Sequence, residues 1–229
     1  MLERELSNAC KDDPSSIFNL IKDGKYEMAY NLVNKNIVSV NTIDGVGNDV
    51  VTRFLKAKQY NYVIELMKKK NWNVNHQNYE GNTFGHILAQ DNSMMAGKVA
   101  EQLTKKSNYL PNIRNNKGFS AMDIALSNNY LCTAFKILED KRFTDIDIFS
   151  FKNLFNVSIQ NKDYGKYSRI TNLEIIVENM DKKELNSSLA NIINIIKTNM
   201  EAIKWEIMHN KYNILESIIN NYYFISLFY

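Results

Sequence analysis

The chain has 229 residues, of which 45% are hydrophobic and 23% charged, and its formal net charge is +3 at pH 7. This composition predicts a folded protein rather than a disordered one, and the small charge argues against a dedicated nucleic-acid binder. The two cysteines, Cys10 and Cys132, have no cysteine or histidine at ligand spacing. The sequence therefore predicts neither a disulfide framework nor a zinc site, and it favours a reducing compartment.

The N-terminus shows no targeting pattern. Residues 1–6 carry charges where a signal peptide needs an apolar core, and no apolar run approaches the roughly 18 residues of a membrane span. We therefore expect no membrane span. The expected location is the cytoplasm or the nucleus, and association with a virion is the alternative. The abundance of Asn, Ile, Lys and Tyr hints at AT-rich coding DNA, such as that of a large DNA virus or a protist.

Most of the chain reads as pairs of short helices. Asp13-Pro14-Ser15 predicts a capped helix start, because proline fits the first helical position. After the turn at Gly24, apolar residues at i, i+3, i+4 and i+7 predict a second helix. They are Tyr26, Ala29, Tyr30 and Val33. The same spacing recurs at Tyr60, Val63, Ile64 and Met67, behind a first helix near residues 50–55.

Continuing in this way, we expect modules near residues 13–41, 42–75, 76–114, 115–147 and 148–185. The third module is overlong, and we assign its excess, between Ala89 and Pro111, to a loop. The fifth keeps two helical stretches, 151–160 and 172–180, and residues 168–170 interrupt its pattern.

Residues 186–229 form a predicted C-terminal helical capping segment, which a stack of half-exposed modules requires. Asn186-Ser187-Ser188 is its expected N-cap, and the apolar stripe from Leu189 to Ile207 predicts one long helix or two helices broken near Asn199. The run Tyr222 to Tyr229 is the most apolar in the chain. Either it folds back over the last helix pair, which we prefer, or it docks into a partner or supports self-association.

Three patterns of different chemistry recur along the chain. A glycine followed by a hydroxyl residue and an apolar run occurs at 81–89 and 118–125, 37 residues apart. An apolar residue followed by Asn, Arg or Asp occurs at 40–41, 74–75, 113–114 and 146–147. A polar turn followed by tyrosine leads to Tyr26, Tyr60, Tyr130 and Tyr164, with one copy missing in the middle. A period of about 20 to 50 residues is typical of stacked repeats.

The motif and spacing resemble the ankyrin repeat, whose core is T-P-L-H-x-A. Family letters are kept at Thr83, His86, Ala89 and Ala125, whereas Phe84 and Ala121 stand where the family has Pro, and Asp123 where it has His. The resemblance implies an all-α, ankyrin-type helical repeat solenoid with short finger turns, divergent repeats and about five modules plus the C-terminal cap. It also implies that the His86 ring bonds the backbone of the adjoining turn.

No pattern indicates catalysis. The chain lacks a nucleophile elbow, a Walker loop and a kinase signature, and the glycines at 45 and 47 lack the strand and lysine of a phosphate loop. The three histidines have no metal-binding spacing. We expect no enzyme, no cofactor, no metal and no small-molecule substrate, and we keep association with nucleic acid only as a remote alternative.

The expected function is that of a non-catalytic scaffold, adaptor or inhibitor, which the resemblance implies binds a partner protein on a concave finger surface. The alternative is a structural component of a larger assembly such as a virion, docked through its ends. The expected partner-binding residues are finger tips whose side chains stacking does not require: Thr42, Ile43, Asp44, Gln77, Asn78, Tyr79, Glu80, Asn115, Asn116 and Lys117. Tyr79 is the best single anchor.

Overall fold

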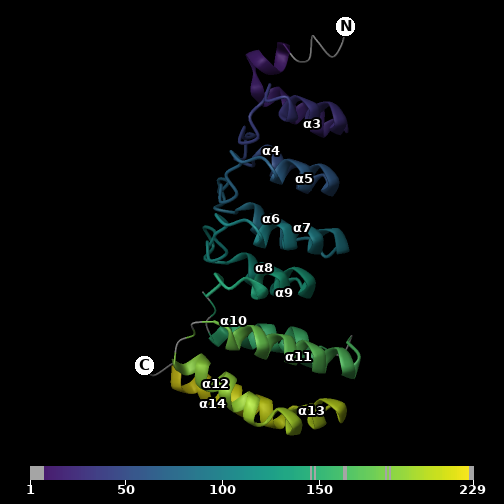
Figure 1. Ribbon diagram of the computed structural model, residues 1–229. Coiled ribbons are helices and arrows are strands. Elements are labelled where there is room, and N and C mark those ends of the chain that lie inside the picture. The colour runs from purple at the N-terminus through teal and green to yellow at the C-terminus, as the bar shows by residue number, and fades with distance from the viewer. Residues whose placement is uncertain are drawn as a thin grey trace. The chain divides into compact units, whose positions relative to one another are not determined.

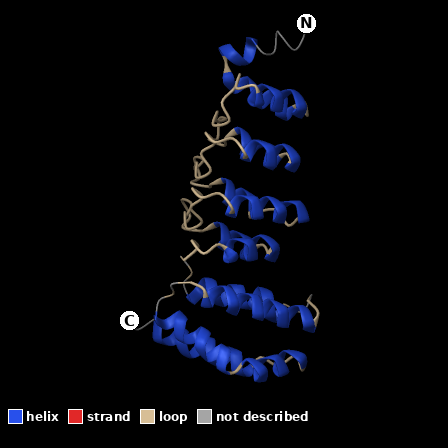
Figure 2. Ribbon diagram, viewed as in Figure 1, coloured by secondary structure: helices blue, strands red, loops and turns tan. Residues whose placement is uncertain are grey.

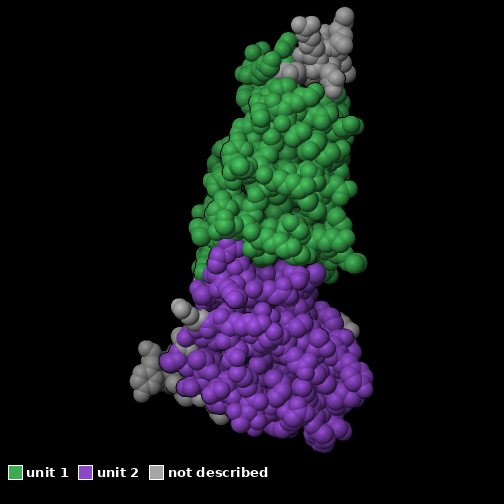
Figure 3. All heavy atoms as spheres, viewed as in Figure 1, with its two compact units in different colours: residues 1–124 green, residues 125–229 purple. Residues whose placement is uncertain are grey.

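The structure is a computed structural model that describes residues 8–226 except 145, 147, 162, 163, 184 and 186, and leaves the side chains of 148, 149, 188 and 221–226 undescribed. Every regular element in this part of the chain is a helix, which confirms the all-α prediction. The chain divides into two compact units, residues 1–124 and 125–229 (Figure 3). The boundary that we predicted at residues 185–186 stays a prediction.

Unit 1 is built of stacked helix pairs (Figure 1). Its elements are η1 (Pro14–Ser16), α2 (Ile17–Lys22), α3 (Tyr26–Asn34), α4 (Val50–Lys56), α5 (Tyr60–Met67), α6 (Phe84–Leu88) and α7 (Met94–Thr104), and α8 (Ala121–Ser127) crosses the unit boundary. The first helices α2, α4 and α6 pack in series, and so do the second helices α3, α5 and α7. The long turns between pairs lie on one side of the helices (Figure 2).

The pairing follows from apolar residues at helical spacing and from caps at the helix starts. The Asp13 carboxylate accepts from the Ser15 N–H at 3.0 Å, as the sequence predicted. The second helices begin at Tyr26, Tyr60 and Met94, each 34 residues after the one before. Met94 therefore holds the place of the missing tyrosine.

The third module corrects the sequence analysis. The excess between Ala89 and Pro111 is not only a loop, because it contains the 11-residue helix α7. Ser93 begins this helix by accepting from the Ala96 N–H at 3.1 Å. The sequence pattern of this helix was hard to recognise because small residues occupy its inner face. Ala96, Gly97 and Ala100 are all buried.

Unit 2 contains longer helices. They are α9 (Leu131–Glu139), α10 (Ile148–Phe155), η2 (Asn156–Gln160), α11 (Lys166–Asp181), α12 (Ser187–Thr198), α13 (Met200–Met208) and α14 (Asn213–Ser226). Within this unit α11 packs on α9, α12 and α13, and α14 packs on α10, α12 and α13. The open question near Asn199 is resolved as two helices, α12 and α13.

The predicted interruption at residues 168–170 is wrong, since α11 runs through it. Arg169, which looked like a polar break, is buried and donates from Nε to the Tyr164 carbonyl at 3.0 Å. Its guanidinium also donates to the Tyr212 hydroxyl and to Asn210 Oδ1. A buried charge is stable where its donors are satisfied in this way.

Some predicted features lie outside the described residues. These are Asp147 of the fourth corner, the turn at Lys162 and Asp163, Asn186 of the expected cap, and residues 227–229 of the apolar tail. The side chains of the tail residues 222–226 are undescribed as well. Among the helices of the described chain, none is both long and apolar enough to cross a membrane.

Candidate functional site

The turns between the helix pairs of unit 1 are three hydrogen-bonded loops, which we call fingers 1, 2 and 3 (residues 43–49, 77–83 and 114–120). In finger 1 the Asp44 N–H donates to the Asn48 carbonyl at 3.0 Å, and the Gly47 N–H donates to the Asp44 carbonyl at 2.9 Å. Fingers 2 and 3 repeat both bonds. The turning glycines, Gly47, Gly81 and Gly118, have φ of 83°, 75° and 80°, a region that glycine adopts without strain.

One side chain closes each finger from within. Oδ1 of Asp44 accepts from the N–H groups of Val46 and Asn48 at 3.0 and 2.9 Å. Asn78 and Asn115 make the same two bonds in their own fingers. The premise that tip side chains are not needed for the stack is therefore wrong for Asp44, Asn78 and Asn115.

Successive fingers are also joined to one another. Asn78 Nδ2 donates to Asn48 Oδ1 at 2.9 Å in a buried contact. One layer further along, Asn115 Nδ2 donates to Asn82 Oδ1 at 2.8 Å. Backbone bonds run beside these amides, from the Tyr79 N–H to the Val46 carbonyl at 3.2 Å and from the Asn116 N–H to the Glu80 carbonyl at 3.0 Å. The fingers thus form a connected ladder that restricts their motion.

A second ladder uses the corner asparagines found in the sequence. Asn41 donates to the Asn71 carbonyl at 2.7 Å and accepts from the Asn73 N–H at 2.8 Å. Asn75 repeats this with the Asn108 carbonyl and the Leu110 N–H, at 2.6 and 2.9 Å. The recurring apolar-Asn corner is therefore a staple between one module and the next.

Finger 2 leads into α6, and Thr83 and His86 cap the start of this helix, as the sequence predicted. His86 Nε2 donates to the Phe119 carbonyl at 2.9 Å, since a carbonyl can only accept. Nδ1 is then the acceptor, and it receives the Thr83 N–H at 3.1 Å and the Thr83 hydroxyl at 2.7 Å. The ring bonds the backbone of the adjoining turn, as the resemblance implied. Ser120 and Asp123 form the corresponding cap one module later.

Burial lowers the pKa of His86, although the Phe119 carbonyl and the charge of Asp123 oppose that shift. Because the unfolded chain binds a proton at higher pH than the folded one, we expect stability to be unaffected by His86 above about pH 6.5 and to fall below it, by up to about 1.4 kcal/mol per pH unit. Urea denaturation between pH 7 and 5.5 measures this slope. An equal slope in His86→Asn would contradict the assignment.

Finger 1 is anchored to the core by a carboxylate. Asp49 accepts from the Thr52 N–H at 2.7 Å and from Trp72 Nε1 at 2.7 Å. Burial raises the pKa of Asp49, and these hydrogen bonds oppose the rise. Trp72 is itself buried and meets the Phe84 ring edge to face at 5.2 Å between centroids. The contacts connect fingers 1 and 2 to one packed aromatic cluster.

The structure distinguishes the predicted partner-binding residues by their surroundings. Tyr79 is 67% exposed, and Ile43 is 39% exposed. Glu80, Gln77, Asn116 and Lys117 are exposed and Thr42 is half-buried. Several also bond within the ladder, because Gln77 donates to the Gly81 carbonyl and Asn116 to the Tyr79 carbonyl. Asn78 is buried, and Asp44 and Asn115 are half-buried.

Two further finger residues were missed. Val46 is 54% exposed and Phe119 is 47% exposed. Val46 directly precedes Gly47, and Phe119 directly follows Gly118. The signal in the sequence was therefore an apolar residue inside an otherwise polar turn. Together with Ile43 and Tyr79 they give each of the three fingers at least one exposed apolar side chain.

The exposed apolar side chains of the three fingers offer contact area. Within the described residues, no three His, Cys, Asp or Glu side chains gather as a metal site would require. No family model matches the chain, and no curated protein matches it.

Proposed function

We propose that the chain is a divergent ankyrin-type repeat protein and that the fingers of unit 1 bind a partner protein without catalysis. The support for the repeat family is internal. The capping pairs Thr83–His86 and Ser120–Asp123, the corner staples and the turning glycines recur at matching positions in successive helix pairs. The ring of His86 occupies the place that the family motif gives to its histidine.

The observation that carries the binding function is the set of exposed apolar side chains on the ladder, Ile43, Val46, Tyr79 and Phe119. Single exposed apolar residues are common, but neighbouring ones mark interaction sites, and Val46 and Tyr79 are joined by a backbone hydrogen bond. Aromatic anchors dominate binding energy at protein interfaces. The ladder fixes the backbone that carries them, so little conformational entropy is lost when a partner binds. The polar neighbours Glu80, Asn116 and Lys117 would form the rim.

A paired capture experiment tests this function. Wild-type protein and a Val46→Ser/Tyr79→Ser variant are immobilised and exposed to the same lysate, and bound proteins are quantified. We expect at least one bound protein to decrease about tenfold or more with the variant, since aromatic anchors contribute about 2 kcal/mol or more each. The changed side chains are exposed, and the ladder bonds at these positions use backbone atoms, so folding should be unchanged.

The matched control is Met94→Ser, which removes an apolar side chain that is 83% exposed but lies outside the fingers. Capture should be the same as for the wild type. If the finger variant captures everything that the wild type captures, the fingers are not the binding surface. If the protein that is lost is the chain itself, the alternative of an assembly component gains support.

A further inference from the structure

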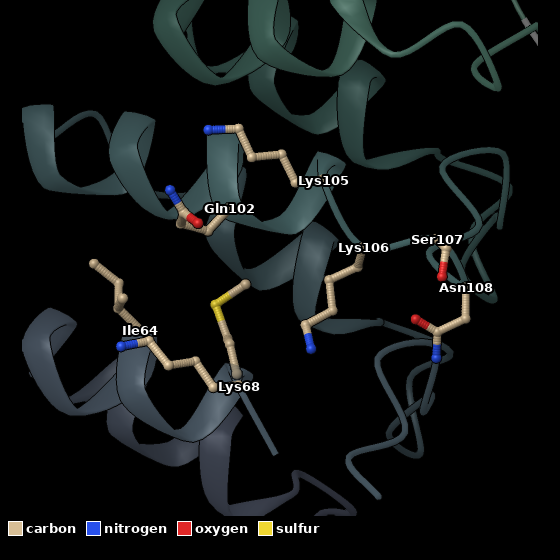
Figure 4. Close-up of a pocket in the computed structure, with 8 residues that line it drawn as sticks. Ile64, Lys68, Gln102, Lys105, Lys106, Ser107 and Asn108 are labelled. Atoms are coloured by element: carbon tan, nitrogen blue, oxygen red, sulfur yellow. The ribbon is translucent and has the colours of Figure 1, made fainter. Parts of the chain in front are cut away.

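An open hollow that the fingers do not use lies between the C-terminal ends of α5 and α7 in unit 1 (Figure 4). Its volume is about 350 Å³. Three lysines and three neutral hydrogen-bonding side chains line it beside two apolar ones, and among the described residues no carboxylate does: Ile64, Met67, Lys68, Gln102, Lys105, Lys106, Ser107 and Asn108. Ile64 lies on α5 and Lys68 directly follows this helix, whereas Gln102 lies in the last turn of α7 and Lys105 and Lys106 directly follow it (Figure 4).

In the preceding layer, a lysine at the end of the second helix bonds the end of the helix before it. Between α3 and α5, Lys69 Nζ donates to Asn36 Oδ1 at 2.9 Å and to the Asn34 carbonyl at 3.3 Å. Lys69 thereby closes the end of α3. In that layer the Lys69 ammonium donates to neutral oxygen acceptors, and these hydrogen bonds join the ends of α3 and α5.

Lys106 is the counterpart of Lys69 one layer later. The Lys69 N–H donates to the Leu66 carbonyl and the Lys69 carbonyl accepts from Trp72, and Lys106 repeats both bonds with Leu103 and Tyr109.

Lys106 takes a different course from Lys69. Its side chain descends from the end of α7 towards α5 (Figure 4). Its ammonium lies over the Trp72 ring, 5.7 Å from the centroid. Partial burial lowers the pKa of Lys106. A partly buried cation attracts an anion more strongly than a fully exposed lysine does.

The other two lysines can turn towards a ligand. Each pairs with a glutamate of the helix that it follows: Lys68 Nζ lies 2.6 Å from a Glu65 carboxylate oxygen, and Lys105 Nζ lies 2.6 Å from one of Glu101. All four side chains are about half exposed or more. Ion pairs of this kind contribute only about 0.3–0.5 kcal/mol, so a doubly charged ligand can readily displace them.

We propose that this hollow binds the phosphate group of a small phosphomonoester. Lysine ammonium groups suit phosphate as point charges, and amide and hydroxyl donors complete the coordination of its oxygens. The volume exceeds that of a phosphate group alone, and Ile64 and Met67 offer an apolar wall for the organic part. This proposal goes beyond the proposed function, because it involves none of the finger residues.

Trp72 provides the readout. The chain has two tryptophans, and Trp205→Phe leaves Trp72, beside Lys106, as the single reporter. The probe is O-phosphoserine, with serine at matched ionic strength as its control. We expect saturable change of Trp72 fluorescence with O-phosphoserine and none with serine. Inorganic phosphate added as competitor should reverse the change, and retention of the signal would mean that groups other than phosphate are recognised.

Lys106→Met keeps the aliphatic stem and removes the ammonium, and it should weaken O-phosphoserine binding about tenfold or more. Lys105→Gln changes an exposed side chain and should weaken O-phosphoserine binding less. This variant replaces Lys106→Met in the test if Lys106→Met is misfolded. Lys56→Gln changes the net charge equally but lies outside the hollow, so it should leave binding unchanged. Absence of saturable binding, or equal weakening by Lys56→Gln and Lys106→Met, would overturn the proposal.

Discussion

Replacing Gly81 by alanine is expected to destabilise unit 1 by roughly 3–5 kcal/mol, more than most single substitutions do. Gly81 has φ of 75°, where an added Cβ introduces about 1–2 kcal/mol of strain. That Cβ would also lie 2.4 Å from Asn116 Oδ1 and 2.6 Å from the Asn116 backbone nitrogen. Finger 3 would have to move, which breaks its bonds to finger 2.

Gly118→Ala is the matched control. Its φ is 80°, but no atom lies within 4 Å of the added Cβ, so strain is the only penalty. We expect a loss of about 1–2 kcal/mol. Urea denaturation followed by circular dichroism gives both values. Equal losses in the two variants would show that contact between fingers 2 and 3 does not contribute to stability.

The helices of unit 1 were predictable because each depends on local residues. Asp13 caps η1, and the Tyr60, Val63 and Met67 spacing places one apolar face on α5. The prediction failed where tertiary contacts decide. Arg169 lies inside α11 because Tyr164, Asn210 and Tyr212 receive its guanidinium, and two of these three lie more than 40 residues further along the chain. No local pattern reports such partners.

The candidate site was only partly predictable for a related reason. Tyr79 was recognised because a tyrosine in a turn of otherwise polar residues is conspicuous. The roles of Asn78 and Asn115 were not, since polar turn residues have the same sequence pattern whether they face solvent or another turn. Their partners Asn48 and Asn82 lie 30 and 33 residues earlier, so only the stacked structure separates ladder residues from exposed ones.

Asn78→Asp is expected to destabilise the protein by about 3 kcal/mol at neutral pH. The introduced carboxylate keeps the oxygen that accepts from Glu80 and Asn82, so finger 2 can still close. Its second oxygen, however, replaces the Nδ2 that donates to Asn48 Oδ1 across 2.9 Å in a buried contact. Two acceptors then face each other, and a buried charge loses hydration, which together amount to a few kcal/mol. Finger 1 tolerates Asp44 at the corresponding position, because Asp44 faces the Asn48 amide of its own finger instead.

The pH dependence of this loss distinguishes the ladder from a general effect of charge. Burial and the facing oxygen raise the folded-state pKa of the carboxyl introduced at position 78 above its unfolded value of about 3.9. The folded variant therefore binds its proton at higher pH than the unfolded chain does, and the loss relative to wild type is complete above the folded pKa. As pH falls through that value, the protonated carboxyl becomes a donor to Asn48 and the loss decreases. The contribution of His86 is present in both proteins and cancels in the difference. Asn115→Asp, at a half-buried site facing Asn82, should show a smaller loss of stability with the same pH dependence. A loss at position 78 that is independent of pH would mean that the Asn78–Asn48 bond does not join the fingers.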